Sequence, residues 1–222
     1  MTITDEMKRA IDLIEGTGDP IYITGKAGTG KTTLLRYIIS SVKDKRFIVT
    51  APTGVAAVNA GGVTMHAFFR IPIGCVNDET DLGGLTKHAV KIINSLDAII
   101  IDEVSMVRPD VLDFIDRKLR KYRMSSLPFG GVQVIMFGDL YQLPPVVKSE
   151  EERILTEHYK GTYFFNAHAF SKTGFHVVEL NHIFRQSDPR FVDILNNICT
   201  YRMTMEDMED LAELKHREAS AS

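Results

Sequence analysis

Tryptophan is absent from this 222-residue sequence, and cysteine is nearly absent. The two cysteines, Cys75 and Cys199, lie far apart with no CxxC spacing, so neither a disulfide framework nor a zinc site is indicated. Such sparse use of cysteine is typical of a reducing, intracellular setting, either a bacterial cytoplasm or a eukaryotic nucleus. No apolar run approaches the roughly 18 residues of a membrane span, and the N-terminal residues contain no apolar signal core, so we expect no membrane partner.

The sequence also lacks a large excess of charge of either sign. Its net charge is −3 at pH 7, although charged residues make up 25% of the chain. Any nucleic-acid-binding surface would therefore have to be a local patch. Hydrophobic residues make up 44% of the chain, enough to bury one good core, so the composition favours a soluble globular protein.

Short apolar runs alternate with helical patterns along the chain. Helices are expected near residues 7–14 and 31–41, and from Pro109 onward; residues 51–62 are expected to form a turn and a helix that Gly61 and Gly62 close. The alternation predicts an α/β fold, in which helices flank both faces of a mostly parallel sheet. We expect the irregular segment 71–87 to lie at the working edge of this sheet. The runs that we predict as strands are residues 21–24, 47–50, 98–101, 132–137 and 176–180.

The helix that opens at Pro109 carries acidic residues early and basic residues late, an order that suits the helix dipole. Its basic end could contact nucleic acid, but a solvated helix end is the interpretation we favour. The residues concerned are Lys118, Arg120, Lys121 and Arg123.

One octapeptide carries the strongest chemical signal. The run from Gly25 to Thr32, GKAGTGKT, fits G-x-x-x-x-G-K-[ST] at every fixed position and stands between a predicted strand and a predicted helix. Its glycines let backbone N–H groups surround phosphate oxygens. Lys31 can reach the β- and γ-phosphates of ATP, and the Thr32 hydroxyl can ligate Mg²⁺. The predicted nucleotide-binding residues are Gly25, Ala27, Gly28, Thr29, Gly30, Lys31, Thr32 and Thr33.

Two carboxylates follow the predicted buried strand 98–101. Asp102 is expected beside the metal ion and Glu103 near the attacking water. Transfer of a phosphoryl group to water needs such a pair, one to hold the cation and one to orient or deprotonate the nucleophile. A strand that ends in Asp-Glu is weak evidence alone, but the phosphate loop upstream makes it strong.

A further polar residue, Gln142, follows the strand that stops at Gly138, in the segment FGDLYQLPPV. Ligands of open parallel sheets lie beyond the carboxyl ends of the strands, so Gln142 could sense the γ-phosphate. A loop that is merely stiffened by proline is equally compatible with these residues.

Six segments, GKAGTGKTT, APTGVAA, TMHAFF, IIIDEVSM, FGDLYQLPPV and LNHIFRQSD, occur in the order of motifs I, Ia, Ib, II, III and IV of superfamily-one helicases. Together they resemble the Pif-one-like branch. The resemblance implies a RecA-like P-loop NTPase domain over residues 1–180, with motif IV, the start of a second RecA-like domain and an acidic tail over residues 181–222. It also implies ATP and Mg²⁺ as cofactors, single-stranded DNA as partner, and movement from 5′ to 3′.

The same resemblance implies roles for further residues. Gln142 matches the γ-phosphate sensor, and Arg185 matches an arginine that contacts the γ-phosphate in the transition state. His66 and Phe69 could stack on bases or could equally be core residues. The residues implied as DNA contacts are Thr53, Gly54, Thr64, His66 and Phe69.

The sequence departs from the family pattern in two ways. Met7 stands where a glutamine commonly recognises adenine, so adenine preference would either rest on shape and backbone contacts or be relaxed. Motifs V and VI have no counterpart, and we expect the second RecA-like domain to be missing from this chain. Two hypotheses therefore stand: an ATP-hydrolysing helicase motor domain, or a nucleotide-gated module that binds single-stranded DNA with negligible turnover.

Overall fold

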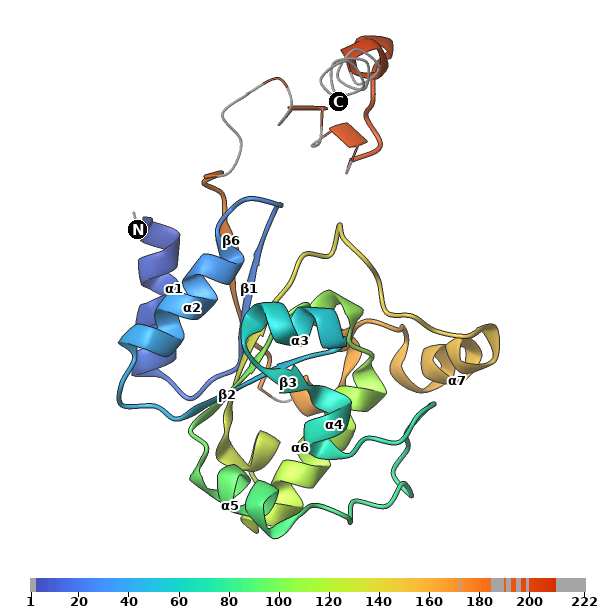
Figure 1. Cartoon of the computed structure of the whole chain (residues 1–222). Coiled ribbons are helices and arrows are strands. Elements are labelled where there is room, and N and C mark those ends of the chain that lie inside the picture. The colour runs from blue at the N-terminus through green and yellow to red at the C-terminus, as the bar shows by residue number, and fades with distance from the viewer. Residues whose placement is uncertain are drawn as a thin grey trace. The chain divides into compact units, whose positions relative to one another are not determined.

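A six-stranded sheet forms the centre of the computed structural model (Figure 1). The structure describes residues 3–171, 173–184, 190, 193–194, 197–198 and 200–210. The chain divides into two compact units, Met1–His182 and Ile183–Ser222. The sheet belongs to the first unit. Its strands are β1 (Ile21–Gly25), β2 (Phe47–Ala51), β3 (Val63–Thr64), β4 (Ala98–Ile101), β5 (Gln133–Phe137) and β6 (His176–Leu180).

Every pairing in this sheet is parallel, and the strand order is β3-β2-β4-β5-β1-β6. The register places Ile100 beside Ile135 and Ile21 beside the same residue on the other side. The five predicted strands are confirmed to within one residue at each end. β3 was not predicted, because two residues leave no periodic pattern to detect.

Helices cover both faces of the sheet, as predicted. On one face, α1 and α2 pack with Ile23, Ile100 and Ile135 in one hydrophobic cluster. On the other face, α4, α5 and α6 pack with Ile99 and Val134. Burial on both faces explains why the central strands are apolar throughout. The helices are α1 (Asp5–Gly16), α2 (Lys31–Ser41), α3 (Gly54–Ala60), α4 (Met65–Phe69), α5 (Lys87–Ser95), α6 (Pro109–Arg123) and α7 (Ser149–Tyr159).

The basic end of α6 is only partly the solvated helix end that the sequence favours: Lys121 is exposed, whereas Lys118 and Arg123 bind backbone oxygens. Lys118 is fully buried, and its Nζ donates to the carbonyl oxygen of Phe69 at 2.5 Å. The Arg123 guanidinium donates to the carbonyl oxygens of Ile93 and Leu96 at 2.6 and 3.0 Å. These two side chains therefore fasten the ends of neighbouring helices to α6. The order of acidic and basic residues along the helix could not reveal these hydrogen bonds, because the acceptors are backbone carbonyl oxygens.

Residues between α4 and α5 form no helix or strand, in agreement with the irregular segment expected there. In the second unit, Arg190 pairs with Asp207 at 3.0 Å and with Asp210 at 2.6 Å. Across the part of the chain that the structure describes, no helix is long and apolar enough to cross a membrane.

Candidate functional site

The loops after β4, β5 and β1 lie next to one another at a single edge of the sheet. This follows from the strand order, because parallel strands place all their carboxyl ends on the same side. The three segments that the sequence marked as chemically active follow these three strands. The fold therefore brings them together, although they are far apart in the chain.

The loop between β1 and α2 has the conformation that a phosphate-binding loop requires. Gly28 and Gly30 have φ values of 83° and 88°, which favour glycine. A Cβ atom on Gly25 would lie 2.6 Å from the carbonyl oxygen of Leu180, so only glycine fits there. Thr29 is buried, and its hydroxyl donates to the carbonyl oxygen of Lys26 at 2.9 Å. Gly30 precedes helix α2 as its N-cap residue and offers no side-chain cap, so the first N–H groups of the helix remain able to bind an anion.

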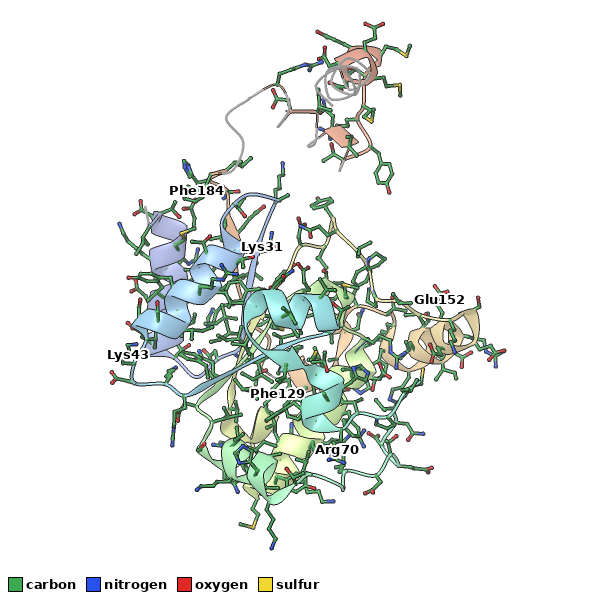
Figure 2. All side chains as sticks on the ribbon, viewed as in Figure 1. Lys31, Lys43, Arg70, Phe129, Glu152 and Phe184 are labelled. Atoms are coloured by element: carbon green, nitrogen blue, oxygen red, sulfur yellow. The ribbon has the colours of Figure 1, made fainter. Side chains whose placement is uncertain are left out.

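Lys31, labelled in Figure 2, opens helix α2 at this edge. Its ammonium donates to the carbonyl oxygens of Gly25 and Lys26, the latter at 3.2 Å. Burial lowers the pKa of Lys31, while the carboxylates of Asp139, Glu103 and Asp102, in that order, act to raise it. The charges of all three carboxylates therefore act on the Lys31 ammonium.

Asp102 and Glu103 follow the completely buried strand β4. The backbone N–H of Glu103 donates to Asp102 Oδ1 at 3.1 Å, and Glu103 has a left-handed φ of 52°. Burial raises the pKa of both carboxyl groups, and the charge of Asp102 further raises that of Glu103. A carboxylate whose pKa is raised toward neutrality is a better general base at physiological pH.

Asp139 is the residue at this edge that our sequence analysis did not select. It is buried beyond β5, and its carboxylate accepts hydrogen bonds from the backbone of Tyr141 at 3.0 Å and from Gln142 Nε2 at 2.9 Å. The sequence did contain a signal for Asp139. It is an acidic residue two positions beyond a buried strand, and that strand lies next to the strand of the phosphate loop.

The candidate DNA contacts lie beyond β2 and β3, on the side of the sheet away from β1. The hydroxyls of Thr53 and Thr64 accept hydrogen bonds at 3.2 Å from Ala56 N and Ala67 N, so both threonines cap short helices. Gly54 begins α3 and is exposed, as is His66 in α4.

Phe69 requires a correction. Its side chain is fully buried in the hydrophobic cluster between the sheet and α6, and its ring packs edge-on against Phe68 with centroids 4.8 Å apart. A ring without exposed surface cannot stack on a base, so we assign Phe69 to the core. Met7 is buried in the opposite cluster, where its side chain packs among apolar residues. Arg185 lies outside the described residues.

A glycine-rich loop between a strand and a helix, with a carboxylate pair beyond a nearby parallel strand, defines the P-loop nucleoside-triphosphate-binding class. Within that class, the family model described as PIF1-like helicase matches residues 2–209. The chain therefore belongs to the PIF1-like helicase family.

Relatives come from fungi, animals and bacteria. The chain is 35% identical over 216 residues to the ATP-dependent DNA helicase PIF1 of Emericella nidulans, covering 93% of this chain and 28% of that protein. Against ATP-dependent DNA helicase Pif1 of Bdellovibrio bacteriovorus the identity is 32%, over 95% of this chain and 46% of the relative. The chain thus spans less than half the length of these two helicases.

A solved structure is similar in fold as well as in sequence. The crystal structure of Pif1 helicase from Bacteroides in complex with ADP-AlF3 and ssDNA superposes with a TM-score of 0.93 at 51% identity. The match covers 97% of this chain and 50% of that one. The RecA-like architecture that the motifs implied is confirmed by this similarity.

Proposed function

We propose that this chain is the nucleotide-binding motor domain of an ATP-dependent DNA helicase that moves 5′ to 3′. The observation that supports this most directly is the convergence of Lys31, Asp102, Glu103 and Gln142 at one edge of the sheet. Binding of the β- and γ-phosphates falls to Lys31 and the loop from Gly25 to Thr33. The solved Bacteroides relative was captured with ADP-AlF3 and ssDNA, which supports the same pair of ligands for this chain.

The residues around Lys31 also fit a magnesium ion. Thr32 is exposed in the first turn of α2, and Asp102 directly follows the buried strand β4. The described residues contain no group of three histidine, cysteine or acidic side chains arranged around a metal position. Mg²⁺ commonly takes only one or two protein ligands and completes its shell with phosphate and water, so Thr32 and Asp102 suffice. The ion would neutralise charge that develops on the γ-phosphate.

Each of the remaining polar side chains would have a separate role in hydrolysis. Glu103 would orient the attacking water and accept its proton, because its pKa is raised toward neutrality. Gln142 would contact the γ-phosphate from the end of β5. Arg185 would add positive charge when the transition state forms.

Single-stranded DNA would cross the carboxyl ends of β2 and β3. There it would contact Thr53, Gly54, Thr64 and His66. Small residues let a phosphate backbone approach, and an exposed imidazole offers a face for a base. The alternative, a binding module with negligible turnover, needs no general base. Glu103 and Gln142 at the nucleotide edge therefore favour the motor.

Replacement of Lys31 by alanine tests the nucleotide site. A charge-assisted phosphate contact contributes roughly 1.5 to 3 kcal/mol, so Lys31→Ala should weaken Mg²⁺-ATP binding about 10- to 150-fold. Isothermal titration calorimetry measures this loss. Lys43→Ala is the matched control, because Lys43 is exposed beyond the other end of α2 (Figure 2). Unchanged affinity in Lys31→Ala would remove the lysine from the site.

A further inference from the structure

The backbone that leads into Asp139 is fixed from two sides. Gly138 donates its N–H to the carbonyl oxygen of Ile23 in β1 at 3.2 Å. A Cβ atom on Gly138 would lie 3.0 Å from Val104 Cγ1 and 3.1 Å from the backbone nitrogen of Ser105. The end of β5 is therefore wedged between the strand that carries the phosphate loop and the turn that follows Glu103.

The carboxylate of Asp139 determines the shape of the next turn. It is only 5% exposed; Oδ1 accepts from Tyr141 N and Oδ2 accepts from Gln142 Nε2. The backbone nitrogen of Gln142 donates to the carbonyl oxygen of Asp139 at 3.0 Å. Gln142 is thus held to Asp139 through both its main chain and its side chain.

This contact also fixes which way the Gln142 amide faces. An ionised carboxylate only accepts hydrogen bonds, so the NH₂ group of Gln142, and not its carbonyl oxygen, must turn toward Asp139. One of the two amide hydrogens is used in that bond. The second hydrogen remains on the same nitrogen and can be donated to an anionic oxygen such as that of a γ-phosphate.

We propose that Asp139 is the positioning residue that orients the Gln142 amide toward the γ-phosphate and so allows the site to distinguish a nucleoside triphosphate from a diphosphate. This inference rests on the proposed function. Asp139 does not touch the nucleotide; it acts through Gln142. Without its carboxylate, the Gln142 amide can rotate and present its carbonyl oxygen, which repels a phosphate oxygen.

A single substitution of Asp139 cannot isolate the orientation of Gln142, because the charge of Asp139 has the opposite effect on the affinity for a γ-phosphate. Its negative charge repels a γ-phosphate and is felt by Lys31. Asp139→Asn therefore removes an unfavourable charge interaction and the orientation of Gln142 at once. A double-mutant cycle separates the two, since the charge effect persists when Gln142 is replaced and the orientation effect does not.

The experiment compares four forms of this chain: wild type, Asp139→Asn, Gln142→Ala and the double variant. Calorimetry with Mg²⁺ gives the affinity of each form for a non-hydrolysable ATP analogue and for ADP. The quantity compared is the affinity for the ATP analogue divided by the affinity for ADP. Asp139→Asn should lower this ratio in the wild-type background at least about fivefold more than it does in the Gln142→Ala background. ADP affinity should change little in every variant, because the loop after β1 binds its phosphates.

Asp97→Asn is the matched control. Asp97 pairs with Arg46 at 2.9 Å before the start of β4, so the same chemical change at the opposite end of a neighbouring strand should leave the ratio unaltered. If Asp139→Asn does not bind ADP because it does not fold, Asp139→Glu takes its place. That variant keeps the carboxylate but displaces it by one methylene group.

The outcomes distinguish the two proposals. Equal effects of Asp139→Asn in both backgrounds would overturn the positioning role while leaving nucleotide binding intact. An unchanged ratio in Gln142→Ala would also overturn it, because Gln142 would then not contact the γ-phosphate. A wild-type chain that binds neither nucleotide would instead overturn the proposed function itself.

Discussion

Carboxyl groups near the two ends of β4 experience opposite environments. Hydrogen bonds from Arg46 lower the pKa of Asp97, which precedes the strand, whereas burial raises the pKa of Glu103, which follows it. The Asp97 carboxylate is thus satisfied by its partner, while the Glu103 carboxylate is held in an environment that disfavours its charge. A carboxyl group whose charge is disfavoured by burial is a candidate for a functional residue, which agrees with the role proposed for Glu103.

These opposite shifts predict opposite effects of removing the charge. The folded pKa of Glu103 lies above its unfolded value of about 4.3, so its ionisation costs stability as pH rises through that interval. Glu103→Gln should therefore raise the melting temperature at pH 7 by a few degrees, and the gain should vanish toward pH 4. Differential scanning fluorimetry from pH 4 to pH 8, without nucleotide, measures the change.

Asp97→Asn is the control of opposite sign. The folded pKa of Asp97 lies below its unfolded value of about 3.9, so its contribution to stability is present at pH 7 and is lost as pH falls through the folded pKa. This variant should melt lower than wild type at pH 7, and the deficit should shrink on acidification. A Glu103→Gln variant that melts lower than wild type at pH 7 would contradict the assignment.

Residues whose proposed function depends on short spacing can be selected from the sequence. Lys31 and Thr32 belong to one octapeptide, whose glycines fix the loop locally. The bond from Gln142 to Asp139 could not be predicted, because it depends on a turn three residues long whose geometry β1 and the turn after Glu103 impose. The sequence left open whether Phe69 is a DNA contact or a core residue, because a five-residue helix is too short to show which of its faces is buried.

At the scale of elements, Arg108 joins three segments. Its guanidinium contacts Asp110 Oδ2 at 2.7 Å at the start of α6, the carbonyl oxygen of Gly74 at 2.6 Å, and Glu151 Oε2 at 3.4 Å in α7. Asp110 is fully buried and also accepts from Val76 N at 3.0 Å. The irregular segment between α4 and α5 is therefore held to α6 by a buried ion pair.

Removal of one partner from this pair should be costly. Asp110→Ala leaves the Arg108 charge without its buried counter-ion and the Val76 N–H without an acceptor, so the free energy of unfolding should fall by about 3 to 5 kcal/mol. Urea denaturation measures the loss. Asp78→Ala is the control: its carboxylate is 85% exposed and 3.6 Å from Arg117. A change there above about 1 kcal/mol, or a small loss in Asp110→Ala, would refute the distinction.

Helix α4 carries His66, the proposed DNA contact that can be tested most directly. Partial burial, followed by the nearby Arg108, lowers the pKa of His66, so its ring is neutral at pH 7. A neutral ring that stacks on a base contributes about 1 to 3 kcal/mol but releases no counter-ion. His66→Ala should therefore weaken single-stranded DNA binding about 5- to 150-fold.

Fluorescence anisotropy at several salt concentrations tests both parts of this prediction. Two or three phosphate contacts give a log–log salt slope of about −1.4 to −2, which His66→Ala should leave unchanged. His88→Ala, an exposed histidine in α5, is the matched control. Unchanged affinity in His66→Ala would place its ring outside the DNA interface.

Elements differed in how far the sequence revealed them. The central strands were predicted because burial on both faces leaves a continuous apolar run. Helix α7 was missed because it buries only Leu155 and Tyr159, too few residues to show a period. Helix α5 likewise buries only Ile93 completely. Tertiary contacts, such as that of Glu151 with Arg108, hold α7 where local pattern gives little signal.

At the scale of the whole molecule, the chain divides into two units, Met1–His182 and Ile183–Ser222. The domain boundary at residue 180 that the motifs imply stays a prediction. The first unit holds the phosphate loop, both carboxylates and Gln142. Arg185, the cation proposed for the transition state, follows the first unit in the sequence and lies outside the described residues. The solved Bacteroides relative is about twice as long as this chain.

We therefore predict that these 222 residues, tested alone, bind nucleotide but hydrolyse ATP slowly and do not unwind duplex DNA. Hydrolysis needs positive charge on both sides of the γ-phosphate, and the first unit supplies one side through Lys31 and the magnesium ligands. An arginine contributed from the other side accelerates hydrolysis by about 10³ to 10⁵. Unwinding further requires two domains that grip the strand in alternation.

The test compares this chain with a chimera that continues into the second half of the Bacteroides relative, which is 51% identical over the shared part. Turnover of ATP is measured with and without single-stranded DNA. The chimera should show DNA-stimulated turnover, and Arg185→Ala in the chimera should lower it toward the rate of the short chain. Rapid, DNA-stimulated turnover by the 222 residues alone would contradict the prediction. A rate that then rose with the square of protein concentration would show that a second copy completes the site.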